Sequence, residues 1–383
     1  MKIPILVCAL AYAVFTFAKD SAWYRDTVTP SLPPQAVFVD PQSFAVLGAN
    51  GTFRQSSFDS GFNPTGTEPP FFQIFDLAFL EVLGKAPTIT EIASNSTNDG
   101  GPLGMSDIDH NNKVGRIDLK DLPANLNGTA INIPVTELDL PPTIQMTNGG
   151  TGPFRGNILL INSGRGPLPP SITLVNPNPP HNATVLLDNF FGRQFNSLND
   201  IKVHPSGKIF FTDVVYGWLN HFRPEPLMPN QVYRLDPDTG AVRVVATDFD
   251  KCNGIAFTGD GKIAYIADTG ASGGFLGNNQ TEPATIYAFD VDPKTQVFKN
   301  RRIFAYADAG VPDGVQVDTE GNVYAGCGDG VQVWNDEGTL LGKFFLGTTS
   351  ANMVFAGKGR LVIMAETKIF LAEIAASPSL FTS

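Results

Sequence analysis

Five segments of the sequence share a pattern in which a polar or small residue stands eight positions before a turn glycine. An apolar run follows each glycine, and the residues at the first position are Asn148, Asn199, Asn253, Asp313 and Ala351. Four of these side chains carry amide or carboxylate oxygens. Calcium takes ~6 to 8 such oxygen ligands, so the set indicates binding of a hard divalent cation, with calcium as the simplest choice.

Each of these residues alone would indicate only a turn, because Asn and Asp favour turns and Asn-Gly and Asp-Gly are turn dipeptides. The shared register favours a common site, since buried amides and a carboxylate that face one another need a satisfying partner. Zinc is disfavoured, because neither the histidines nor the cysteines have ligand spacing. These residues are His110, His181, His204, His221, Cys252 and Cys327.

A second group of oxygen-bearing residues, 107–118, has the spacing of a calcium loop at positions one, three, five and twelve. Asn112 replaces the usual glycine, and no helix is expected on either side. This favours a solvated acidic turn, with a structural calcium site as the alternative. The sequence has no Gly-x-Ser-x-Gly elbow, zincin helix or phosphate loop, so serine nucleophiles and nucleotide binding have no support.

Strands must position the five matched residues, because each segment combines a short alternating strand, a glycine turn and a second strand. Successive segments start 51, 54, 60 and 38 residues apart, which suits four short antiparallel strands per unit. The sequence therefore predicts an all-β, six-bladed β-propeller. Residues 113–140 would form the outer half of the first blade, whose inner strands are missing. A single-domain β-sandwich is the alternative. In a propeller, matched residues on the innermost strands converge near the axis.

The N-terminal region is expected to begin with a signal peptide, 1–18, because Lys2 precedes an apolar run that ends in small residues. An extension, 19–90, with a short helix within 75–83, would precede the propeller at 91–383.

Two cysteines beyond the signal peptide are too few for a disulfide-framed scaffold, and whether they pair is left open. Five glycosylation sequons fit a secreted glycoprotein. They begin at Asn50, Asn95, Asn127, Asn182 and Asn279.

The charge of the chain excludes some partners. The formal net charge is −11, and no Lys/Arg cluster stands out along the sequence. This argues against nucleic acid and anionic membranes. No stretch after the signal peptide has the ~18 to 20 apolar residues that would span a bilayer. A soluble, extracellular protein that acts on a small molecule is expected.

Four motifs make the sequence recognisable: Asn-Ser-Leu-Asn-Asp at 196–200, Cys-Asn-Gly-Ile-Ala-Phe at 252–257, Pro-Asp-Gly-Val at 312–315 and Gly-Cys-Gly-Asp-Gly at 326–330. In combination they resemble the gluconolactonase, regucalcin (senescence marker protein) and luciferin-regenerating family, in particular its secreted fungal branch. The resemblance runs from about Phe44 to the C-terminus. It implies a six-bladed propeller with one catalytic divalent cation, usually calcium, held by a Glu, two Asn and an Asp.

Carried over by motif, Asn199, Asn253 and Asp313 would be metal ligands, and Asp313 would also be the general base of lactone hydrolysis. Asn148 and Asp200 would line the substrate pocket. The resemblance thus implies a calcium-dependent, gluconolactonase-like hydrolase that acts on a lactone or cyclic ester. A non-catalytic propeller that binds a partner on one face is the alternative.

The sequence departs from the family in the first blade. Family members carry a His-Glu-Ala-like segment and two apolar strands ahead of an Asn-Asp-Gly-Gly turn, whereas here residues 92–98 run straight into that turn. The ligand Glu is lost with them, and neither Glu81 nor Glu91 starts a plausible inner strand. Because calcium affinity follows the charge and number of its ligands, impaired metal binding and an incompletely closed ring are expected.

Overall fold

The computed structural model describes residues 31–94, 114–123 and 125–379. These ranges exclude the signal peptide expected at 1–18, the sequon at Asn95 and residues 107–113 of the acidic loop. A single compact unit begins at Pro33. Within the described residues, no helix is long and apolar enough to cross a membrane.

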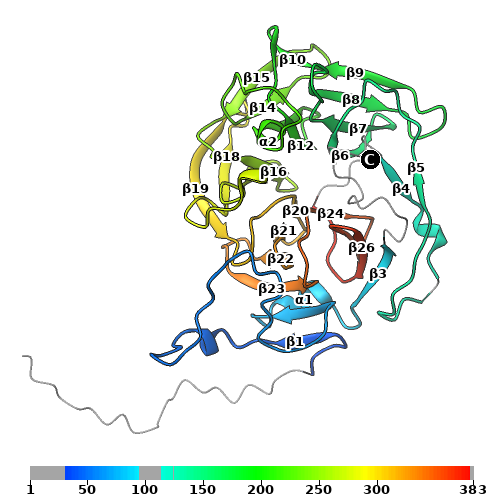
Figure 1. The fold of residues 1–383 in the computed structure, drawn as a ribbon. Coiled ribbons are helices and arrows are strands. Elements are labelled where there is room, and N and C mark those ends of the chain that lie inside the picture. Colours follow the sequence, from blue (N-terminus) through cyan, green and yellow to red (C-terminus); the bar gives the residue numbers. More distant parts are fainter. Residues whose placement is uncertain (1–30, 95–113, 124, 380–383) are drawn as a thin grey trace, which may run out of the picture. The chain divides into compact units, whose positions relative to one another are not determined.

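Five sheets follow one another around a ring, and each is named here by its innermost strand (Figure 1). The β6 blade contains β6 (Thr147–Phe154), β7 (Asn157–Asn162), β8 (Ser171–Val175) and β9 (Ala183–Leu187). The β12 blade contains β12 (Leu198–Val203), β13 (Ile209–Asp213), β14 (Gln231–Leu235) and β15 (Val242–Ala246). The β16 blade contains β16 (Cys252–Phe257), β17 (Ile263–Asp268), β18 (Thr285–Val291) and β19 (Phe298–Tyr306).

The last two blades recruit strands from the N-terminal part of the chain. The β20 blade contains β20 (Val315–Val317), β21 (Val323–Cys327), β22 (Gly330–Trp334) and β23 (Leu340–Phe345). At its outer edge β2 (Phe71–Ile74) pairs with β23, and β1 (Ala36–Phe38) lies parallel to β2. The β24 blade contains β24 (Asn352–Phe355), β25 (Arg360–Ala365), β26 (Lys368–Glu373) and, as its outermost strand, β3 (Thr88–Ser94). This pairing joins early and late parts of the chain in one sheet.

The all-β propeller is confirmed, but the number of blades was predicted wrongly. The described residues form five blades, not six. Where the outer half of another blade was expected, β4 (Gly115–Ile117) and β5 (Val135–Glu137) form only a two-stranded sheet. Proline cannot donate a ladder hydrogen bond, and Pro123, Pro134, Pro141 and Pro142 interrupt this region, so its backbone pairs over only three residues per strand.

The helices are few and short. α1 (Phe79–Leu83) lies within the segment expected to be helical, and α2 (Tyr216–Leu219) follows β13. The remaining pieces are the 3₁₀ turns η1 (Pro41–Phe44), η2 (Leu119–Asp121) and η3 (Gly274–Leu276), and the short β10 (Asn189–Phe190) to β11 (Arg193–Gln194) hairpin.

Apolar layers between neighbouring blades form the core. In β13 the side chains of Phe210 and Phe211 point to opposite faces, because side chains alternate along a strand. Phe211 packs in the layer shared with the β6 blade, and Phe210 packs in the layer shared with the β16 blade. Both are fully buried, and each contributes roughly 1.5–3 kcal/mol of burial free energy. These layers fix the inner strands, which carry the candidate site.

Candidate functional site

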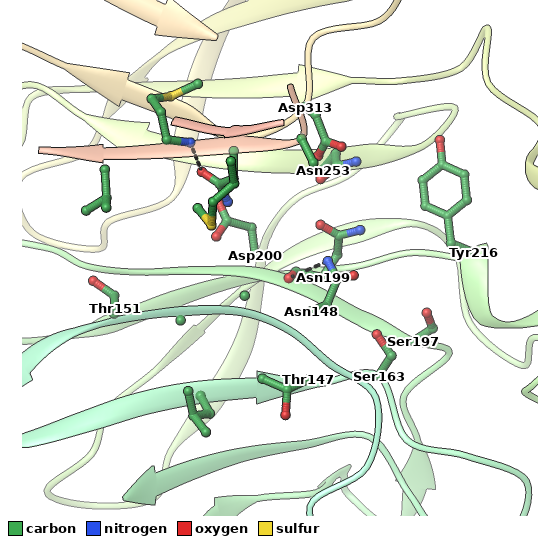
Figure 2. A pocket seen from close by; sticks show the side chains of 18 of the residues that line it. Thr147, Asn148, Thr151, Ser163, Ser197, Asn199, Asp200, Tyr216, Asn253 and Asp313 are labelled. Atoms are coloured by element: carbon green, nitrogen blue, oxygen red, sulfur yellow. Dashed lines mark hydrogen bonds between the residues drawn. The ribbon is translucent and has the colours of Figure 1, made fainter. Parts of the chain in front are cut away.

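A cavity of about 620 Å³ is lined by residues from the innermost strands of all five blades or from the residues just before those strands. Every residue predicted for the site lines this cavity. They are Asn148, Asn199, Asp200, Asn253 and Asp313, and Ala351 lines it as well. Figure 2 shows Asn199, Asn253 and Asp313 directed toward the same space. The shared register in the sequence thus corresponds to convergence in space.

The three Asn residues lie at irregularities of the inner strands. The pairing of β12 with β13 shifts between Leu198 and Ile201, so Asn199 falls inside a β-bulge. The pairing of β16 with β17 shifts between Cys252 and Ile255, around Asn253. An equivalent shift surrounds Asn148 in β6. A bulge re-aims a side chain, which explains how these amides turn toward the cavity.

Glycines next to two of these residues allow the inner strands to approach one another closely. A Cβ on Gly254 would collide with the carbonyl oxygen of Asp313, and a Cβ on Gly314 would collide with the side chain of Asn352. Neither glycine has a positive φ. Asn253-Gly and Asp313-Gly therefore are not turn dipeptides here: the glycines make room for the neighbouring backbone.

Buried aspartates hold the segments that lead into the inner strands. The carboxylate of Asp213, at the end of β13, accepts hydrogen bonds from the backbone N–H groups of Asn196 (3.0 Å) and Ser197 (2.8 Å). In the next blade, the carboxylate of Asp268 accepts from the N–H groups of Asp250 (3.0 Å) and Lys251 (2.8 Å). These bonds fix the backbone just before Asn199 and Asn253.

Asp313 is the electrostatic centre of the site. Burial raises the pKa of its carboxyl group to about 7, and the negative charges of Asp200 and Glu366 contribute in the same direction. A side-chain hydrogen bond with Asn253 acts in the opposite direction. No ion pair neutralises Asp313 within the described residues. A positive charge in the cavity would therefore stabilise the ionised carboxylate.

The side-chain amide of Asn199 is open to the cavity. Asn199 is only 7% exposed, and its side chain makes no hydrogen bond with any other described residue. The amide of Asn148 instead donates to the backbone carbonyl of Asn199 at 3.1 Å, which braces the strand (Figure 2). Because the amide reaches the cavity, water or a ligand bound there can satisfy it.

Asp200 also lines the cavity, but its carboxylate has a structural role. One oxygen accepts the N–H of Ile201 at 2.8 Å, and the other accepts the N–H of Ile255 in the neighbouring blade at 2.9 Å. Burial raises the pKa of this carboxyl group, while the nearby charge of Lys202 lowers it. Asp200 therefore links two inner strands beneath the site.

Sequence reasoning missed several polar groups of the cavity wall, among them Lys202, Tyr216 and Glu366. Glu366 follows β25, where no turn-glycine register marks it. The hydroxyl group of Tyr216 lies 2.6 Å from that of Thr269, and both residues line the cavity. Trp218, two residues after Tyr216, is 43% exposed and does not line the cavity.

Cys252 and Cys327 are buried and form no disulfide with each other, which answers the question the sequence left open.

The oxygen donors of the cavity fit a hard cation. Asn199, Asn253 and Asp313 offer two amide oxygens and a carboxylate, which is the ligand chemistry of calcium. Within the described part of the chain, no group of three or more His, Cys, Asp or Glu side chains could hold a metal. A cation at this site would therefore depend on amide oxygens as much as on carboxylates.

A known protein family matches the part of the chain that contains most of the inner strands. The sequence profile of the SMP-30/Gluconolactonase/LRE-like region matches residues 170–366, which is about half of the chain. This chain belongs to the SMP-30/gluconolactonase/LRE-like family. The matched region contains Asn199, Asn253 and Asp313, so the family assignment covers the three donors that meet in the cavity.

Relatives of this family share sequence over part of their length. Lactonohydrolase oryL of Aspergillus oryzae is 32% identical over 203 residues, covering 49% of this chain and 46% of the relative. The gluconolactonase of Zymomonas mobilis is 28% identical over 193 residues, covering 48% of this chain and 51% of the relative. The chain thus spans about half the length of these curated relatives.

Solved structures of the family share the fold over most of the chain. A gluconolactonase from Xanthomonas campestris superposes with a TM-score of 0.61 at 25% identity, covering 81% of this chain and 96% of that protein. A calcium-binding regucalcin from Agrobacterium tumefaciens superposes with a TM-score of 0.53 at 15% identity, covering 76% of this chain and 96% of its own. The second likeness is one of fold alone.

Proposed function

We propose that this chain hydrolyses a small lactone or related cyclic ester in the axial cavity, with a divalent cation, most simply calcium. The convergence of Asn199, Asn253 and Asp313 from three blades carries this proposal. It gains support from the family, whose relatives include a lactonohydrolase and a gluconolactonase. The acidic chain, without a basic cluster, argues for a small-molecule substrate and against nucleic acid or anionic membranes.

In this proposal Asn199, Asn253 and Asp313 hold the cation. When bound, the cation polarises the ester carbonyl and makes a nearby water more acidic. The hydrogen bond between Asn253 and Asp313 keeps two of the donors in a fixed relation before the cation arrives. Preformed donors lose little conformational freedom on binding, which favours affinity.

Asp313 is the proposed general base. Its raised pKa, about 7, places it where a carboxylate both ionises and accepts a proton near neutral pH. It takes a proton from water as the water oxygen bonds to the carbonyl carbon. The ring C–O bond then breaks, and the proton passes to the released alkoxide. The products are a hydroxyl group and a carboxylic acid, which releases its proton to solvent near neutral pH and becomes a carboxylate.

Asn148 and Asp200 are proposed to contribute to substrate binding in different ways. Asn148 uses one amide N–H on the backbone of Asn199, which leaves its carbonyl oxygen and second N–H for a substrate hydroxyl group. Asp200 shapes the cavity wall, since both of its oxygens accept backbone N–H groups. Changing Asp200 should therefore disturb the fold more than substrate recognition.

Secretion with glycosylation is part of the proposal, as is membership of a fungal branch. Four of the five sequon asparagines lie within the described residues, and all four are exposed, which suits glycan attachment. They are Asn50, Asn127, Asn182 and Asn279. Measuring the mass of the protein from culture medium, before and after enzymatic deglycosylation, tests this.

Turnover of a lactone panel tests the proposed function. The purified chain should hydrolyse at least one sugar-type lactone when calcium is present, and a chelator should abolish that activity. Asp313→Ala should also abolish it while the circular dichroism spectrum is retained. A folded protein with no turnover under any metal would instead support a non-catalytic propeller that binds a partner.

Loss of the ligand Glu of the first blade should weaken the proposed site. Calcium affinity follows ligand charge and count, so affinity below that of relatives with the complete blade is expected. Titration calorimetry with calcium measures it. Binding as tight as in a relative with the complete set would show that the missing segment does not impair this chain.

A further inference from the structure

We propose that Glu366 supplies the second negative charge of the axial cation site, in place of the Glu missing from the first blade. This inference rests on the proposed function. Glu366 lines the same cavity as Asp313, Asn199 and Asn253. With it, the cavity offers two carboxylates and two amide oxygens, drawn from four of the five blades.

Backbone hydrogen bonds connect Glu366 to Asp313. The N–H of Gly314 donates to the carbonyl of Ala351 at 2.9 Å, and the N–H of Ala351 donates to the carbonyl of Met364 at 3.1 Å. Met364 lies two residues before Glu366 at the end of β25. The position of the Glu366 turn is thereby tied to the segment that carries Asp313.

The β24 blade has no other donor at the matched position. Its residue in the shared register is Ala351, whose methyl group carries no oxygen. Glu366 lies on the adjacent strand connection of the same blade and reaches the same cavity. The blade can therefore contribute a carboxylate to the site although its inner strand does not.

Glu366 has no alternative partner. Within the described residues its carboxylate makes neither a hydrogen bond nor an ion pair, whereas nearby Lys368 pairs with Glu91 at 2.8 Å. Its charge reaches Asp313 and raises the pKa of that group. Glu366 is exposed and Asp313 is half-buried, so water screens part of the repulsion between the two carboxylates, and a cation between them would remove the rest.

The backbone of Glu366 is also unusual. Its φ is +52°, in the left-handed region that glycine adopts readily and Glu rarely does. The turn between β25 and β26 has only Glu366 and Thr367 between the paired residues Ala365 and Lys368. A two-residue hairpin turn requires a positive φ at its first residue or at both, so the turn accounts for this backbone, and Glu adds a carboxylate that glycine would not.

Calcium titration of matched variants tests the inference with a readout independent of activity. The wild type, Glu366→Gln, Asp313→Asn and Glu337→Gln are titrated by calorimetry, and their unfolding temperatures are measured with and without calcium. Glu337, in the β22–β23 turn, is exposed and outside the cavity, so it is the control. We expect Glu366→Gln to bind calcium at least about tenfold more weakly, with Glu337→Gln unchanged.

The outcomes separate the two proposals. Binding that is lost in Asp313→Asn but unchanged in Glu366→Gln would overturn the role of Glu366 and leave the proposed function standing. A folded wild type that binds no divalent cation would overturn both. A weakened Glu366→Gln together with a weakened Asp313→Asn would support both.

Discussion

Gly254 lies directly against the backbone carbonyl of Asp313, and no Cβ fits between the two neighbouring inner strands. This contact explains why glycine follows Asn253, and a similar contact with the side chain of Asn352 explains why glycine follows Asp313. Asn253 and Asp313 are followed by glycine because the adjacent strand occupies the space of a side chain. The donors are thus held close together by backbone packing around the axis.

Gly254→Ala should therefore damage both stability and the site. We expect a loss of roughly 1–3 kcal/mol in unfolding free energy, because the strands must separate to admit the methyl group. Calcium affinity should fall as Asp313 moves. Urea unfolding and calorimetry measure these effects, and Gly61→Ala, at an exposed position with a nearest contact of 3.4 Å, is the control. A fully stable Gly254→Ala would contradict the close packing.

Asp313 should make stability depend on pH when no cation is present. Its pKa is near 3.8 in the unfolded chain and about 7 in the folded protein, so folding favours the protonated form. The stability from this group is fully present below about pH 4 and is lost as the pH rises to about 7. Asp313→Asn should remove this loss, so the free energy of unfolding of the variant should rise relative to that of the wild type between about pH 4 and pH 7. Parallel unfolding curves at pH 4, 5.5, 7 and 8 measure the difference, and a constant difference would refute the shift.

The rate of lactone hydrolysis should rise with pH as Asp313 ionises. In kcat/KM the apparent pKa should lie at or below about 7, because a bound cation favours the ionised carboxylate. Asp313→Asn should lose about 10²- to 10⁴-fold in kcat and show no such limb. A stopped-flow pH-indicator assay in matched buffers measures both quantities. If kcat/KM of the variant still rose with pH near 7, the general base would be another group.

Glu366→Gly should separate strain from function. Left-handed backbone costs a non-glycine residue roughly 1–2 kcal/mol, and glycine avoids most of this cost, so the cation-free protein should gain stability. The same change should weaken calcium binding, whereas Glu366→Gln keeps the strain and loses only the charge. Denaturant unfolding and calcium titration on all three proteins provide the comparison. A Glu366→Gly variant that gains no stability would show that the turn is not strained.

The repeat register predicted which residues converge because it reflects a geometric rule. Residues eight positions before the turn glycine lie at the start of each inner strand or just before it, so Asn148, Asn199, Asn253 and Asp313 could be placed at one cavity without coordinates. The same rule could not find Glu366, which follows the second strand of its blade. Nor could it distinguish a turn glycine from Gly254. Glycine is required at that position because a backbone segment more than fifty residues further along the chain leaves no room for a side chain.

The blade count failed for a related reason. The sequence of the segment that forms β4 and β5 predicts half of a sixth blade beside the five repeat units, and the family resemblance implies the same total. Sequence patterns show where strands can form but not whether their partners exist in the chain. In the described residues only the two-stranded sheet is present, so five blades surround the cavity.

A crystal structure of the protein grown with calcium would show whether the axial cavity holds a cation. We expect one strong anomalous peak in the cavity, within about 2.3–2.6 Å of oxygens from Asn199, Asn253 and Asp313. A cavity that shows only water at saturating calcium, or a cation bound elsewhere while these three side chains stay unliganded, would contradict it.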